Sequence, residues 1–152
     1  MIEVVRSGRV DASPERVWHL VSRTERAPEW LSFAESAEVI SGSGCGQRRR
    51  LYSRWGKRRS EVDQEVIEYR RPLVVAWRHI AERLDGRPAP RFAETTEFRV
   101  ELEPAGEGTL VRLRSLQQPA SPVRGLLIKL FGSKEIAQGM ERSLVRLADV
   151  LR

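Results

Sequence analysis

Hydrophobic and polar residues alternate in steps of two in two segments of the chain, the pattern of strands with one covered face. In the segment 92–103, Phe98, Val100 and Leu102 alternate with charged residues, and the segment 109–117 repeats the pattern. Glycine, proline or aspartate occurs at each break, where a chain reversal is needed. Short connections imply antiparallel neighbours, so we expect a meander. The seven predicted strands are 3–10, 35–41, 47–55, 58–69, 73–84, 92–103 and 109–117.

Two short helices are predicted between the first and second strands. Ser13 can accept a hydrogen bond from the first helical turn, and Pro14 suits the first helical position, so a helix is expected from residue 14. A second short helix begins at Thr24 or Ala27 and carries Trp30. The chain therefore turns through two helices before it enters the meander.

The C-terminal segment has the periodicity of a long helix with one buried stripe. Ser121 and Pro122 repeat the capping pattern of the first helix, and Gly132–Ser133 predicts a bend or a break. Apolar residues then recur at steps of three and four. They are Ile136, Met140, Leu144, Leu147 and Leu151.

Length and composition indicate one globular domain, residues 1–152. Hydrophobic residues make up 40% of the chain and charged residues 32%, which is typical of a soluble protein and not of a disordered one. No apolar run approaches the roughly 18–20 residues of a membrane-spanning helix. The first residues lack the order of a signal peptide, and Cys45 has no second cysteine to pair with. We therefore expect a cytoplasmic location.

The order of these parts, together with five separate signatures, resembles the START-like or SRPBCC superfamily and its bacterial polyketide cyclase/dehydrase-like branch. The signatures are Val10–Trp18, Pro28–Trp30, Glu68–Trp77, Gly108–Val111 and Ser143–Leu147. The resemblance implies an α+β helix-grip fold. In that fold a seven-stranded curved antiparallel sheet wraps around the long C-terminal helix, two short helices follow the first strand, and an apolar cavity lies between sheet and helix.

The resemblance makes the binding of a hydrophobic, lipid-like or aromatic small molecule the leading functional hypothesis. Aromatic and aliphatic walls with few polar groups suit such a site. The residues expected to line the cavity are Trp30, Tyr52, Trp77, His79, Phe98, Leu113, Leu127 and Phe131. The segment 125–131 is expected to form a wall or gate of the cavity rather than a membrane contact, and stable membrane insertion is not expected.

A polyketide cyclase or dehydrase that moves a proton in the cavity is the second hypothesis. His79 is the best single titratable candidate, because it lies two residues after Trp77 and so shares its face of the strand. Gln64 or Glu94 would supply a second polar group. If the strand is turned the other way, His79 lies in solvent and this hypothesis loses its proton carrier.

Nucleic-acid binding through a basic hairpin is the third hypothesis. The formal net charge is +6, and arginines cluster around Gly56 in the hairpin 48–59, with Tyr52 and Trp55 between them. The same arginines have Glu61, Asp63 and Glu65 on the neighbouring segment. Cross-strand ion pairs on a solvated face are therefore the preferred interpretation.

Motifs for metals and cofactors are not visible in the sequence. His19, His79 and Cys45 lack the spacing of metal ligands, and no glycine-rich phosphate loop or nucleophile elbow occurs. We expect neither a metal nor a cofactor. A hydrophobic small molecule is the expected partner, and a monomer and a homodimer are both compatible with the sequence.

Overall fold

The computed structural model describes the whole chain, residues 1–152, except for the side chain of Trp55. The strands are β1 (Ile2–Val10), β2 (Ser36–Ser41), β3 (Arg48–Trp55), β4 (Arg58–Arg70), β5 (Val74–Leu84), β6 (Arg87–Pro88), β7 (Ala93–Ala105) and β8 (Gly108–Pro119). The helical elements are α1 (Pro14–Val21), η1 (Thr24–Arg26), α2 (Ala27–Trp30), α3 (Pro122–Leu127), η2 (Ile128–Gly132) and α4 (Ser133–Val150).

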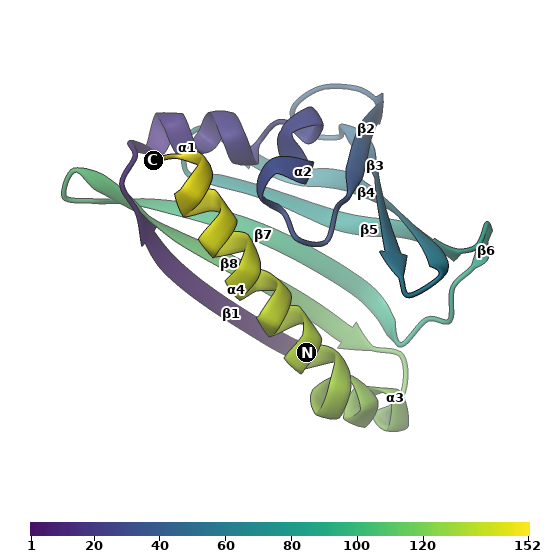
Figure 1. Ribbon diagram of the computed structural model, residues 1–152. Coiled ribbons are helices and arrows are strands. Elements are labelled where there is room, and N and C mark those ends of the chain that lie inside the picture. Colours follow the sequence, from purple (N-terminus) through teal and green to yellow (C-terminus); the bar gives the residue numbers. More distant parts are fainter.

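One antiparallel sheet carries the whole fold, and its strand order is β1-β8-β7-β5-β4-β3-β2, with β6 paired only to β5. Helix α4 crosses one face of this sheet, α1 and α2 lie at the end where the chain terminates, and α3 lies at the other end of α4 (Figure 1). This arrangement confirms the predicted helix-grip fold. The seven predicted strands correspond to all strands but β6, a two-residue pairing within the connection from β5 to β7.

The core lies between the sheet and α4 because strand alternation turns one set of apolar side chains toward the helix. Val100 of β7 and Leu113 of β8 are paired in register and fully buried. Met140 and Leu147 of α4 are fully buried as well, which confirms the apolar stripe predicted for this helix. Burying side chains of this size contributes about 1.5–3 kcal/mol each relative to exposure.

Helix boundaries follow the predicted caps. The Ser13 hydroxyl accepts a hydrogen bond from the backbone N–H of Arg16 at 3.3 Å, and Ser121 does the same for Arg124 at 3.1 Å. Near the predicted interruption at Gly132–Ser133, the helix passes through a π-helical turn, η2, and then continues as α4. The helical path is therefore not broken at this point.

A close approach at Gly139 fixes α4 against the segment that follows α2. The Ser32 hydroxyl donates to the Gly139 carbonyl at 2.7 Å, and the Ser32 N–H donates to the Ser143 hydroxyl at 2.9 Å. A Cβ atom at Gly139 would overlap the ring of Phe33. That ring also packs edge-on against Phe98, with ring centroids 6.5 Å apart, so it is held from both sides.

Replacing Gly139 with alanine tests this contact. Helix propensity alone would make the change stabilising by about 1 kcal/mol. Because the added methyl group overpacks the Phe33 ring, we expect Gly139→Ala to lower the free energy of unfolding by about 1–3 kcal/mol instead. Urea denaturation measures the change, with Gln138→Ala on the exposed side of α4 as the control. Adding Phe33→Leu should restore much of the loss, and a stabilised single variant would contradict the contact.

Candidate functional site

A row of polar side chains crosses three neighbouring strands on the face that points toward the core. Arg49 of β3 lies opposite Gln64 of β4, and Gln64 lies opposite His79 of β5. Leu51 and Val66, two residues further along their strands, are buried in the core. Alternation therefore places this row on the inner face of the sheet.

Three consecutive arginines begin β3, and the two-residue alternation separates them. Arg48 and Arg50 point outward, where Glu65 and Asp63 lie opposite them at 3.7 and 2.7 Å. The inward arginine, Arg49, has the neutral Gln64 opposite it. Each outward arginine therefore has a counter-ion on the neighbouring strand, while the arginine that is turned into the core has only an uncharged amide.

The Arg49 guanidinium is completely buried, with 0% of the residue exposed. Its Nε–H donates to the Gln64 side-chain oxygen at 2.8 Å, and its Cζ lies 3.8 Å from the centroid of the Trp77 ring. Neither Nη1 nor Nη2 has a hydrogen-bond partner among the residues whose side chains the structure describes. Burial lowers the pKa of Arg49 to about 9, so the group still carries its charge at neutral pH.

One aromatic ring, that of Trp77, lies against this charge, and a second ring packs behind it. Trp77 stacks on Phe98 with ring centroids 6.3 Å apart and an angle of 26° between the planes. The indole N–H groups of Trp77 and Trp30 are also buried and lack an acceptor within the described part of the chain. Together with Arg49, these groups give the core several unpaired donors, and each such donor costs about 1–3 kcal/mol when it is left unsatisfied.

Four of the predicted cavity residues lie in the core. Trp30, Trp77 and Leu113 are almost fully buried, and Phe98 is 8% exposed. All four belong to the one cluster of buried hydrophobic side chains that forms the core. The structure therefore brings them together on the side where the sequence places the cavity.

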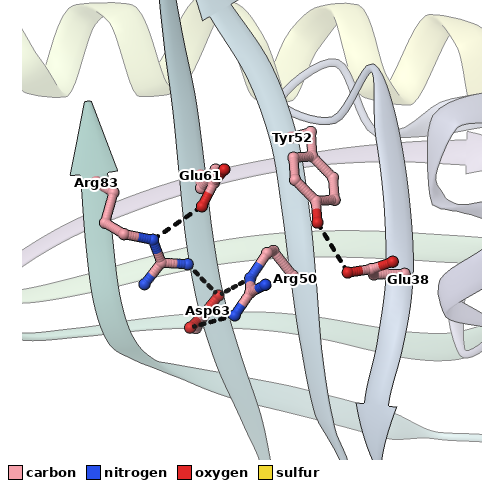
Figure 2. Close-up of polar contacts among 6 residues, drawn as sticks. All are labelled: Glu38, Arg50, Tyr52, Glu61, Asp63 and Arg83. Carbon is pink, nitrogen blue, oxygen red and sulfur yellow. Dashed lines mark hydrogen bonds and ion pairs between the residues drawn. The ribbon is translucent and has the colours of Figure 1, made fainter. Parts of the chain in front are cut away.

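Tyr52 lies on the opposite face of the sheet from the one predicted. Its hydroxyl donates to a Glu38 side-chain oxygen at 2.7 Å on the outer face (Figure 2). The reason is strand parity, because the inward position on this part of β3 belongs to Leu51. Tyr52 is thus part of the solvated face and not of the interior.

Leu127 and Phe131 also lie outside the core, at 39% and 66% exposure. The short helical segment α3–η2 buries only one narrow face, which carries Gly125 and Ile128. Within this segment Gly125 and Ile128 are buried, whereas the side chains of Leu127 and Phe131 are exposed.

His79 occupies the end of the inner polar row. It shares a face of β5 with the buried Trp77, as predicted, and its side chain is 21% exposed. Its Nδ1 lies 3.0 Å from a Glu82 carboxylate oxygen, and this hydrogen bond lowers the pKa of Glu82. Of the two suggested polar companions, Gln64 is buried beside Arg49 and Glu94 is exposed.

The outer face of the basic hairpin is an ion-pair network, as the preferred interpretation of its sequence predicted. Asp63 accepts hydrogen bonds from Arg50 at 2.7 Å and from Arg83 at 2.9 Å, and Arg83 also binds Glu61 at 2.8 Å (Figure 2). The hydrogen bond from Arg50 is the main cause that lowers the pKa of Asp63. These arginines are held by carboxylates of the same sheet, and nothing in the arrangement supports nucleic-acid binding.

Other sites considered from the sequence have an ordinary placement. His19 lies exposed on α1, and Cys45 is exposed in a turn. No group of three or more histidine, cysteine, aspartate or glutamate side chains suited to a metal occurs among the described residues. Within the same residues, no helix is long and apolar enough to cross a membrane.

Sequence reasoning missed Arg49, which it assigned to the solvated basic hairpin. A signal was nevertheless present in the run Asp63–Glu65, where only the middle position is neutral. The structure pairs this run residue by residue with Arg48–Arg50. With Leu51 taken as inward, the same parity turns Arg49 inward as well. The sequence alone did not show the register in which β3 pairs with β4.

The comparison with protein families finds one match that covers the chain from end to end. The model of the family described as polyketide cyclase/dehydrase and lipid transport matches residues 1–152. No curated protein matches the chain.

Solved structures share the fold at low sequence identity. TTHA0849 from Thermus thermophilus has a TM-score of 0.77 at 22% identity, with 99% of this chain and 97% of that chain covered. A START superfamily protein from Mycobacterium smegmatis has a TM-score of 0.75 at 17% identity, with 98% and 96% covered. XoxI from Bacillus cereus has a TM-score of 0.75 at 17% identity, with 99% and 96% covered.

The outer network gives a pH-dependent prediction. Because the folded state lowers the pKa of Asp63, its carboxylate stabilises the fold above its ordinary pKa of about 4, and this contribution is lost as the pH falls through the lowered value. We expect Asp63→Asn to lower the free energy of unfolding by about 1 kcal/mol at pH 7. Denaturation from pH 7 to pH 2.5 should show the gap to the wild type closing, while Glu103→Gln, at an exposed position, stays near the wild type.

The buried guanidinium gives a prediction of the opposite sign. Replacing a buried charged group and its partner with apolar side chains of similar length is often stabilising, by roughly 1–4 kcal/mol. We expect this gain for the double variant Arg49→Met/Gln64→Met in chemical denaturation of the ligand-free protein at pH 7. The control Arg50→Met, one residue away on the outer face, should be neutral or destabilising. A double variant less stable than the wild type would contradict the assignment of Arg49 as a costly buried charge.

Proposed function

Since the chain belongs to the polyketide cyclase/dehydrase and lipid transport family, we propose that it binds a hydrophobic small molecule, lipid-like or aromatic, between the sheet and α4. The observation that carries the proposal is the buried Arg49, whose Nη1 and Nη2 lack partners within the described structure. A buried charged group without hydrogen-bond partners does not stabilise the fold. A bound molecule that pairs with this group gains binding affinity from it.

The chemistry of the surrounding side chains supports the same proposal. Trp30, Trp77, Phe98 and Leu113 contribute aromatic and aliphatic surface, and they are the residues we propose to contact the ligand. Gln64 and Arg49 add a small number of polar atoms to this surface. Such a combination orients an apolar ligand through a few polar contacts while its main affinity comes from burial.

Tryptophan fluorescence and native mass spectrometry test the proposal. Apolar ligands such as long-chain acids, their esters and aryl ketones should quench the tryptophan fluorescence and raise the melting temperature. Trp77→Phe should lose much of the quenching. Trp18→Phe replaces a buried tryptophan of α1 that packs against Tyr69, and should keep the quenching. Absence of binding by every apolar compound, together with no mass shift from a co-purified molecule, would refute the proposal.

A cyclase or dehydrase activity is the second candidate, and the His79–Glu82 pair favours it. Glu82 lies 3.0 Å from Nδ1 and can orient the ring, so that Nε2 is available to take a proton next to a carbonyl group of the ligand. His79 lies at the more exposed end of the row that runs from Arg49 through Gln64, which supports its access to the proposed ligand.

Hydrogen exchange separates this candidate from simple binding. If His79 moves protons, the protein accelerates the exchange with D₂O of the protons next to the carbonyl of a bound aryl ketone, and His79→Gln abolishes the acceleration without changing ketone affinity. If the ketone protons exchange equally fast with the wild type and with the variant, the enzymatic candidate is refuted and binding stands as the function.

A further inference from the structure

The direction and number of the unpaired polar atoms in the core carry information about the ligand itself. Arg49 uses its Nε–H on Gln64, which leaves both Nη groups without a partner in the described part of the chain. The Trp77 ring lies 3.8 Å from Cζ and covers one face of the guanidinium. The edge that carries the two Nη groups has no protein partner, and the surrounding protein covers it, so a bound molecule reaches it only when the covering side chains move aside. Two parallel N–H groups in one plane match the two oxygens of a carboxylate.

The unpaired atoms on Arg49 and on the tryptophan that covers it have the same polarity. Arg49 Nη1 and Nη2 and Trp77 Nε1 are all donors. An alcohol or an amine would bring further N–H or O–H hydrogens to a site that already has a surplus of them. A group that only accepts hydrogen bonds fits this surplus.

The charge of the site decides between a neutral and an ionised acceptor. Among the described side chains no carboxylate pairs with Arg49, because the acids of β4 that flank Gln64, Asp63 and Glu65, point to the outer face. A buried charge without a counter-ion is unfavourable, and a neutral ester would supply acceptors without removing that cost. One guanidinium balances a single negative charge, which matches a carboxylate and not a phosphate dianion.

We propose that Arg49 binds the carboxylate of a hydrophobic acid, with the apolar part of the molecule against Trp77 and Phe98. This inference rests on the proposed function, since it names the class of the molecule bound there. Gln64 acts as a positioning residue, because it holds Nε and thereby sets the plane in which the carboxylate is received.

A series of matched ligands tests the inference by fluorescence titration or calorimetry at pH 7. The series consists of dodecanoic acid, methyl dodecanoate and dodecanol, and 2-naphthoic acid with its methyl ester. The wild-type protein should bind each acid about 10- to 100-fold more tightly than the corresponding ester or alcohol, as expected for a hydrogen-bonded charge pair.

Substitutions at two adjacent positions of β3 locate the effect. Arg49→Met should weaken acid binding to the level of the ester while ester binding is kept, which also shows that the variant is folded. If that variant does not fold, Arg49→Met/Gln64→Met takes its place. Arg50→Met removes an arginine from the outer face and should preserve the preference for acids.

The possible outcomes distinguish the carboxylate assignment from the proposed binding function. Equal binding of acid and ester by the wild type would overturn the carboxylate assignment and leave the proposed function standing. A preference for acids that survives in Arg49→Met would also overturn it. No binding of any member of the series would refute the proposed function itself.

Discussion

The two-residue alternation of side chains in a sheet of fixed register is the constraint on which this structure depends. In the antiparallel order β1-β8-β7-β5-β4-β3-β2, strands such as β7 and β8 turn alternate side chains toward the core and the others toward solvent. The same alternation that buries Val100 and Leu113 under α4 also turns Arg49 into the core. A shift by one residue in the pairing of β3 with β4 would expose Arg49 and bury its neighbours, so the buried Leu51 and the register with β4 hold the charge inside.

That placement has an energetic consequence. Proteins seldom bury a charge without a partner, and the unsatisfied donors of Arg49 oppose folding of the ligand-free chain. The aromatic ring of Trp77 offsets part of this cost by about 0.5–2 kcal/mol, and Gln64 satisfies one of the donors. Local instability of this sort is commonly found where a protein binds something, because the bound molecule supplies the missing contacts. The outer face shows the contrast: there every arginine of the network in Figure 2 has a carboxylate to pair with.

Much of the fold could be predicted from the chain alone, and the site only in part. Ser13 and Ser121 cap their helices as expected, and Met140 and Leu147 form the buried stripe. Helix caps and apolar stripes depend on residues within one or two helical turns, so they can be predicted from the local sequence. Tyr52 and Phe131 were misplaced for a different reason. Their orientation depends on strand parity and on how far a short helix extends past the sheet, which are properties of the packed molecule.

Local sequence was sufficient to specify the order of strands and helices, the face of each element that is apolar, and the family to which these parts point. It was sufficient because periodicity and capping act over short distances along the chain. The packed sheet was needed to show that Arg49, among three successive arginines, lies inside. That outcome depends on the register by which β3 and β4 pair, and on Trp77 arriving from β5 to cover the guanidinium. Contacts between strands combine residues that are distant in sequence, and the chemistry of the candidate site arises from that combination.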